Sequence, residues 1–140
     1  MILARRLICA LWAGLLVAIG ALVAPTLFAI LDNRLVAGRI AGELFTRATI
    51  LSCAIALALI VLSRAHRPPL PRWQALLPLV PSTLLAANEL GVRPLLEAAR
   101  VAAGSASPAF MAWHGASAGL YVLATVAAVC LLVVELRRQP

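Results

Sequence analysis

The 140-residue chain is too apolar and carries too few charges for an ordinary soluble domain. Its residues are 64% hydrophobic and 12% charged, and its mean hydropathy is +1.02, whereas soluble domains are about half apolar and about one quarter charged. The net charge of +7 comes from arginines, most of which flank apolar runs. This pattern argues against nucleic-acid binding and makes the lipid bilayer the expected partner.

The first predicted helix covers about residues 7–28. The uncharged run from Leu7 to Leu31 is 25 residues long, which exceeds the roughly 7 to 15 apolar residues of a secretory signal. We therefore expect a retained membrane helix and no cleaved targeting segment. Pro25 is expected to end or bend this helix, because proline removes a backbone donor.

The second and third predicted helices have shorter uncharged runs. The second, about residues 40–63, needs the small and apolar residues of "AGRIAGELFTR" to reach the roughly 20 residues of a span. The third, about residues 73–89, contains Pro78 and Pro81, whose freed backbone groups neighbouring helices can satisfy in a membrane. The connection after it contains "RPLLEAARVAAG", whose apolar spacing predicts a short interfacial helix at about residues 93–102.

The fourth predicted helix covers about residues 110–134 and completes an all-α, integral membrane four-helix bundle, with residues 1–140 as a single membrane domain. An even number of spans places both termini on one side. Arginines are more numerous in the terminal segments and the loop between the second and third helices than on the opposite side. By the positive-inside rule, both termini are expected in the cytoplasm, in a bacterial inner membrane.

Polar residues gather on the predicted outer side of the second helix. Arg39, Glu43 and Arg47 are spaced so that a carboxylate lies between two guanidiniums on one helical face. Two interpretations remain open. The residues form either a helix start at headgroup level or, because the charges compensate one another, part of a polar vestibule that dips into the bilayer.

The fourth helix carries a polar stripe that starts at a histidine. His114, Ser117, Tyr121 and Thr125 follow one helical face, and unpaired polar groups in hydrocarbon are costly, so the stripe is expected to face protein. His114 is interpreted either as an interhelical hydrogen-bonding residue or as a handle for a proton or ligand. The candidate vestibule consists of Arg39, Glu43, Arg47, His114, Ser117 and Tyr121.

Small residues indicate helix packing. Gly38 and Gly42 form one GxxxG pair, and Gly115 and Gly119 form another, a spacing that permits close approach of membrane helices. These pairs predict a tight bundle or a homo-oligomer. The three cysteines are isolated inside apolar runs and are interpreted as packing residues.

Two segments carry a resemblance to a known family. The run "LWAGLLVAIGALVAPTLFAILD" followed by "AGRIAGELFTR", together with "FMAWHGASAGLY", resembles the domain of unknown function 4149 family, which is related to eukaryotic transmembrane protein 205. The resemblance implies a four-helix membrane protein and carries no established activity. By motif position, its signature residues are Pro25, Phe28, Gly38, Gly42, Phe45 and His114.

A more distant similarity links the chain to the copper-resistance membrane domain and to a haem-containing bacterial oxidase. These relatives use histidines in their membrane helices. A haem needs an axial ligand, and His114 is the residue in a suitable position to provide one. The sequence contains no HExxH, no glycine-rich phosphate loop and no Ser/His/Asp set. We therefore expect no enzyme, no cofactor and no metal site.

Three functions remain as hypotheses. The first is a noncatalytic helical bundle that acts by packing with itself or with a membrane partner. The second is a small-solute or metal-ion transporter with a polar outer vestibule, and the third is a haem- or metal-binding membrane protein.

Overall fold

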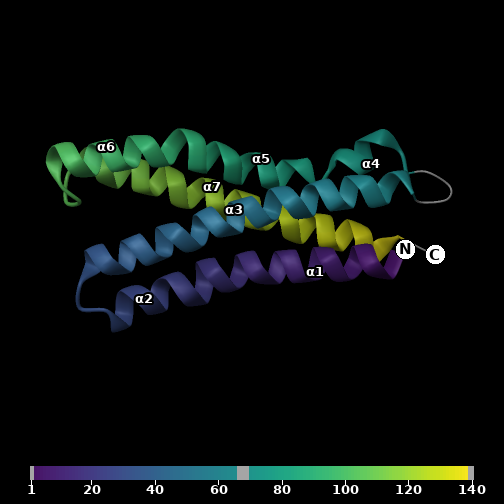
Figure 1. Ribbon diagram of the computed structural model, residues 1–140, viewed down its shortest axis with the longest axis horizontal. Coiled ribbons are helices and arrows are strands. Elements are labelled where there is room, and N and C mark those ends of the chain that lie inside the picture. Colours follow the sequence, from purple (N-terminus) through teal and green to yellow (C-terminus); the bar gives the residue numbers. More distant parts are fainter. Residues whose placement is uncertain (1, 66–69, 139–140) are drawn as a thin grey trace.

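The computed structural model describes residues 2–65 and 70–138, which form helices joined by short turns, with no strand among them (Figure 1). The helical elements in chain order are α1 (Ile2–Ala18), η1 (Ile19–Val23), α2 (Ala24–Ile30), α3 (Arg34–Arg64), α4 (Arg72–Leu76), α5 (Leu79–Ala87), η2 (Asn88–Val92), α6 (Arg93–Ala103) and α7 (Pro108–Arg137). The two η elements are π-helical and continue directly into the α-helices beside them.

Four helical stretches are long and apolar enough to cross a membrane, and they confirm the predicted four-span architecture. They are Ile2–Ile30, Arg34–Arg64, Arg72–Ala103 and Pro108–Arg137, each 29 to 32 residues long. At about 1.5 Å per residue such a helix is roughly 45 Å long, whereas the hydrocarbon layer is about 30 Å thick. The chain is therefore a multi-pass membrane protein whose helices extend beyond the apolar layer.

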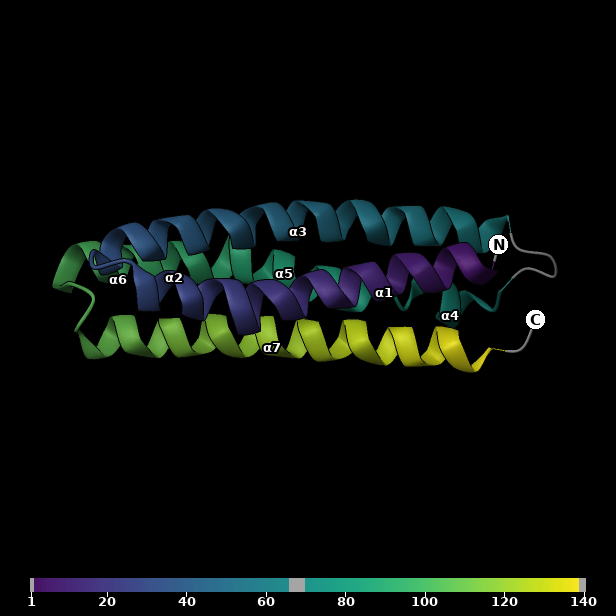
Figure 2. The same cartoon turned by 90° about the horizontal axis from the view of Figure 1, so that it is seen from below.

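The chain ends and the turns between spans lie at opposite ends of the bundle. Ile2 and Arg138, the first and last described residues, lie at one end, which we call the terminal end (Figures 1 and 2). The α2–α3 and α6–α7 turns lie at the opposite end, which we call the turn end. This arrangement is the one that an even number of antiparallel spans requires.

The second and fourth spans each begin at a polar residue that caps the helix, and the second begins well before its uncharged run. The side chain of Asn33 accepts hydrogen bonds from the N–H groups of Leu35 and Val36. Ser107 accepts one from the N–H of Phe110. Such caps satisfy donors that a helix start leaves unpaired, so α3 and α7 start within polar sequence.

The first span continues through its proline. The N–H of Ala24 donates to the carbonyl of Ile19, the wide spacing of a π-turn. Pro25 follows immediately, and the helix runs on to Ile30. A proline ring clashes with the carbonyl of the preceding α-helical turn, and the wider π-turn relieves this clash. Pro25 therefore does not end the helix, although the sequence allowed that outcome.

The third span differs from the expectation of a helix followed by a separate interfacial helix at 93–102. The element α6 follows η2 with no loop between them and packs against α7, in line with α5 (Figure 1). A π-turn again precedes a proline, because the N–H of Arg93 donates to the carbonyl of Asn88 directly before Pro94. This turn accommodates the proline inside one continuous helical stretch, which the sequence pattern presented as two.

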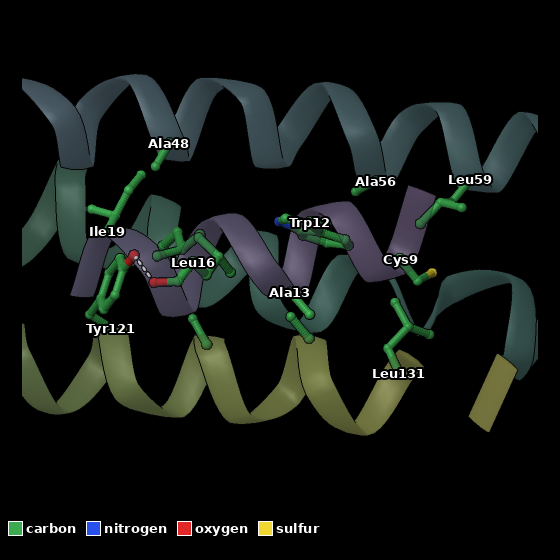
Figure 3. Close-up of a cluster of buried hydrophobic side chains, with 13 residues drawn as sticks. Cys9, Trp12, Ala13, Leu16, Ile19, Ala48, Ala56, Leu59, Tyr121 and Leu131 are labelled. Atoms are coloured by element: carbon green, nitrogen blue, oxygen red, sulfur yellow. Dashed lines mark hydrogen bonds between the residues drawn. The ribbon is translucent and has the colours of Figure 1, made fainter. Parts of the chain in front are cut away.

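The core of the bundle combines a few large side chains with many alanines. Trp12, Leu16, Leu59 and Leu85 are at most 1% exposed. Figure 3 shows Trp12 and Leu16 projecting from α1 among side chains of the neighbouring helices. The alanines of this core cluster are Ala13, Ala48, Ala56, Ala124 and Ala128. Small residues let helix backbones approach closely, which is how membrane helices gain packing energy.

Candidate functional site

A buried ion pair joins the two terminal helices at the terminal end. Arg5 on α1 and Glu135 on α7 are 130 positions apart and each is 1% exposed. The Nη2 atom of Arg5 lies 2.8 Å from Oε1 of Glu135, and Nε lies 3.2 Å from Oε2. This is the two-pronged geometry in which arginine and carboxylate bind most strongly.

The same arginine also reaches the second span. Its Nη1 atom donates to the carbonyl of Leu59 and to the hydroxyl of Ser63, each at 2.6 Å. The Ser63 hydroxyl in turn donates to the Leu59 carbonyl at 2.7 Å. A buried charge is tolerable only when its donors are paired, and Arg5 meets this requirement by tying α1, α3 and α7 together.

Two further arginines lie beside Glu135, one on its carboxylate and one on the main chain. Arg138 places Nη1 at 3.1 Å from Oε1 of Glu135, while Arg6 donates to the main-chain carbonyls of Glu135, Leu136 and Arg138. Burial lowers the pKa of the Arg138 guanidinium, and the Glu135 carboxylate partly opposes this effect. In the terminal cluster, defined as Arg5, Arg6, Glu135 and Arg138, two guanidiniums thus bind one carboxylate and a third binds the main chain beside it.

A second polar cluster lies nearer the turn end, between the second and third spans. The Thr46 hydroxyl donates to Oε1 of Glu89 at 2.8 Å, and Arg93 donates to both Thr46 and Glu89. These three residues form the outer cluster and are partly buried. Asn88, next to Glu89, has a buried Oδ1 atom without a hydrogen-bond partner in the described part of the chain.

Two glycines of the second span leave room for side chains of other elements to pack against α3. A Cβ atom added at Gly42 would lie 3.3 Å from Nη2 of Arg93, so Gly42 makes room for the guanidinium of the outer cluster. A Cβ atom at Gly38 would lie 3.9 Å from the ring of Phe28, which is an ordinary contact. The motif "AGRIAG" therefore places Phe28 and Arg93 against α3.

Replacing Thr46 by valine is expected to lower the free energy of unfolding by about 1 kcal/mol. The change keeps the side-chain shape but removes the oxygen that Glu89 and Arg93 share. Thermal unfolding of the purified protein in detergent measures the effect. The matched control is Thr83→Val on α5, where the side chain is exposed, and equal stability of the two variants would contradict the role of the outer cluster.

The residues of the predicted vestibule occupy different environments. Arg39, Glu43 and Arg47 are exposed, and Arg47 pairs with Glu43 at 3.0 Å, with 74% and 59% of the side chains exposed. His114 is also exposed and stacks on Phe110, with ring centroids 5.8 Å apart. Among the residues described, no hydrogen bond or ion pair joins His114 to the charged residues of α3.

The residues of the polar stripe of α7 differ in how deeply they are buried in the bundle. Ser117 is half-buried, whereas Tyr121 is buried and donates its hydroxyl to the Leu16 carbonyl at 2.8 Å (Figure 3). Thr125 donates to the Tyr121 carbonyl on its own helix. Within the described residues, Tyr121 is therefore the member of the stripe that makes an interhelical hydrogen bond.

The glycines of α7 do not pack within the described chain. A Cβ atom added at Gly115 or Gly119 would meet nothing within 4 Å, and both residues are exposed. Gly20 differs from them because it lies directly against a side chain of another helix: an added Cβ there would lie 2.7 Å from the Tyr121 ring. The GxxxG spacing alone did not distinguish an inward from an outward glycine.

Polar contacts at mid-membrane depth also escaped the sequence interpretation. The indole N–H of Trp12 donates to the Ser52 hydroxyl at 2.8 Å, and the Ser82 hydroxyl donates to the Ser52 carbonyl at 2.9 Å. These bonds connect α1, α3 and α5. The hydropathy pattern presents Arg5 and Glu135 only as flanking charges, although Glu135 is an isolated acid between apolar and arginine residues, a signal that indicates a buried partner.

Comparison with known protein families gives a match to the first part of the chain. The family model described as Domain of unknown function (DUF4149) matches residues 7–105. No curated protein and no solved structure matches the chain. The matched region contains the outer cluster and the "AG.IAG.LF" element, while Arg5 and all of α7, including His114 and Glu135, lie outside it.

Proposed function

The chain belongs to the DUF4149 family of membrane proteins, and on that premise we propose that it is a noncatalytic helical bundle that acts by packing with itself or with a membrane partner. The proposal places the protein in a bacterial inner membrane with both termini in the cytoplasm. It assigns the polar side chains of the spans to holding the four helices together.

The observation that carries this proposal is the use of the polar groups at mid-membrane depth. Trp12, Ser52, Ser82 and Tyr121 are all buried, and each donates to or accepts from another span. Polar groups mark a solute path when they face a water-filled cavity. Groups whose hydrogen bonds are made to neighbouring helices stabilise packing instead.

The charge of the two ends supports the proposed orientation. Within the described ranges, Glu135 is the acid at the terminal end, and the arginines there are Arg5, Arg6, Arg64, Arg72, Arg137 and Arg138. At the turn end, acidic residues accompany the arginines. Cytoplasmic segments carry the excess of basic residues, so the terminal end is assigned to the cytoplasm.

Site-specific photo-crosslinking in native membranes tests the packing proposal. A crosslinker at the exposed positions Leu57 and Leu123 is expected to trap a second polypeptide, either another copy or a partner. The matched control is Ala124, which neighbours Leu123 and is fully buried. The absence of any product at both exposed positions, in membranes where the protein accumulates normally, would refute the proposal.

A transporter is the second candidate, because one observation favours it. The Glu89 carboxylate and a buried Asn88 Oδ1 without a hydrogen-bond partner in the described part of the chain belong to consecutive residues of the third span, and intramembrane ionisable groups often belong to transport sites. Flux of small cations into proteoliposomes, abolished by Glu89→Gln, would support this alternative over packing. The first proposal expects no flux above that of protein-free vesicles.

A further inference from the structure

An ion pair on the second span faces away from the bundle. Arg47 and Glu43 lie 3.0 Å apart on α3, and 74% and 59% of their side chains are exposed. The neighbouring Thr46 faces the third span and binds Glu89, so the ion pair lies on a different face of the helix. How deep this face lies in the membrane decides what surrounds it.

Contacts of a neighbouring residue give the depth of the pair. The ring of Phe45, two positions before Arg47, packs on the ring of Tyr121 with centroids 4.7 Å apart. Tyr121 lies near the middle of α7 and donates to the carbonyl of Leu16, in the middle of the first span (Figure 3). Two residues correspond to about 3 Å along a helix. The backbone of Arg47 therefore lies close to the middle of the bundle, roughly 15 Å from either edge of a hydrocarbon layer about 30 Å thick and centred on the spans.

An exposed ion pair at this depth lacks the water that surrounds a surface pair. Within the described ranges, Nε of Arg47 and Oε1 of Glu43 form the one side-chain hydrogen bond of the pair. The Nη atoms and Oε2 have no partner in that part of the chain. Ionised groups in hydrocarbon are costly, and the middle of the layer is too deep for the Arg47 guanidinium to reach the headgroups. The pair therefore marks a face that another polypeptide covers.

The chemistry of this face is complementary to itself. The ion pair presents guanidinium donors and a carboxylate acceptor side by side, and as a pair it is neutral. In a two-fold dimer whose axis follows the membrane normal, equal heights of the two α3 helices meet. Arg47 already spans one helical turn to Glu43 in its own chain, and the same reach brings it to the carboxylate of a second copy. A purely acidic or purely basic partner would leave one member of the pair unsatisfied.

The apolar continuation of this face has the spacing of a helix-packing seam. From Arg47 toward the terminal end, exposed residues of α3 recur at alternating intervals of three and four positions, namely Ile50, Ala54, Leu57 and Val61. This is the seven-residue repeat that keeps two helices in contact along their length. Membrane helices commonly pack at the corresponding crossing angle. Two copies of the chain can therefore pair along the inner half of α3 as well as at the ion pair.

We propose that this face of α3 is the interface through which two copies of the chain pair in the membrane, with both Glu43 carboxylates and both Arg47 guanidiniums forming one neutral group. The inference rests on the proposed function, in which the bundle packs with itself, and it names the surface used. In detergent micelles the copies are diluted apart and water reaches the pair. The pair therefore contributes to association in the bilayer and little to the folding of one chain.

Cysteine crosslinking in native membranes tests the interface. The exposed Cys53 and Cys130 are first replaced by alanine, and the buried Cys9 is kept. In this background, Ile50→Cys is expected to give a disulfide-linked homodimer on oxidation. A disulfide requires Cα atoms within about 7 Å of each other, so the product reports close approach of the two α3 helices.

The matched control, Val126→Cys, places a thiol at the same depth on another helix. Val126 lies five residues after Tyr121, as Ile50 lies five residues after Phe45. The exposed fractions of Val126 and Ile50 are 53% and 66%, so the two thiols are similarly accessible to the oxidant. Val126→Cys should give little or no homodimer.

Energy transfer between labelled copies in liposomes measures the part played by the charges. Glu43→Gln keeps the side-chain shape and is expected to weaken association about threefold to thirtyfold, the range of polar contacts between membrane helices. The matched control is Glu97→Gln, which breaks another exposed pair, with Arg100 on α6, and should leave association unchanged. The crosslinking result is obtained with the ion pair intact and does not depend on folding of Glu43→Gln.

Four results would overturn the interface. Equal disulfide yields from Ile50→Cys and Val126→Cys would indicate random collision, and a product containing a different polypeptide in place of the homodimer would indicate another partner. Unchanged association of Glu43→Gln would show that the ion pair lies outside the contact. A second polypeptide trapped at Leu123 on α7, without a homodimer at Ile50, would leave the packing function standing and refute this surface alone.

Discussion

Replacing Glu135 by alanine is expected to lower the free energy of unfolding by about 3–5 kcal/mol, the largest effect of any single change considered. The substitution leaves the Arg5 guanidinium buried without the carboxylate that binds it through two nitrogen atoms. Ser63 and the Leu59 carbonyl satisfy only Nη1. Unfolding in mixed micelles, followed by tryptophan fluorescence, measures the loss, and the amount of protein in membranes should fall with it.

Two controls separate a buried charge from a general defect. The double variant Arg5→Met/Glu135→Leu should be more stable than Glu135→Ala, because it removes both charges and leaves Ser63 bonded to the Leu59 carbonyl. Glu43→Ala breaks an exposed pair and should cost less than about 1 kcal/mol. If Glu135→Ala unfolds at the temperature of the original protein, the buried pair does not hold the helices together.

Replacing Gly20 by alanine is expected to cost about 1–3 kcal/mol. The added Cβ would lie 2.7 Å from Cε1 of Tyr121, so the ring must move. The ring is confined, because its hydroxyl donates to the Leu16 carbonyl and the ring packs edge-to-face with Phe45, with centroids 4.7 Å apart. Detergent unfolding curves of the two proteins give the difference directly.

The same substitution at Gly14 is the matched control for this prediction. Gly14 lies on the same span and an added Cβ meets nothing within 4 Å, so Gly14→Ala should be neutral or stabilising, since alanine favours helices over glycine by about 1 kcal/mol. Tyr121→Phe should lose only the hydroxyl contact, about 0.5–1.5 kcal/mol. Equal stability of the Gly14 and Gly20 variants would contradict the contact between η1 and Tyr121.

The outer residues show how far spacing alone predicts a site. The i, i+4 relation of Glu43 and Arg47 correctly placed them in contact, because both lie on one helix and helical geometry determines their separation. The grouping of these residues with His114 needed the relative rotation of two helices. In the structure Thr46, next to Arg47, faces the third span and binds Glu89, while Glu43 and Arg47 face outward.

The glycine motifs illustrate the same limit. Gly42 and Gly119 both belong to GxxxG pairs, yet only Gly42 lies against another element, at Arg93. Gly20 is not part of either predicted pair, yet among the glycines of the described chain it makes the closest approach to another helix. A GxxxG motif shows that one face of a helix carries only small residues, but it does not identify the helix, if any, that packs against that face.

The sequence by itself determined that this chain has four membrane spans and that its described ends lie together, because span number and hydropathy are properties of continuous segments. It also determined the family, through "AP.LF" and "AG.IAG.LF" in the matched region. Only the tertiary structure decided that Arg5 meets Glu135 and that Trp12 meets Ser52. These pairings depend on which helix faces turn toward each other, a choice made by packing of whole spans that no local pattern encodes.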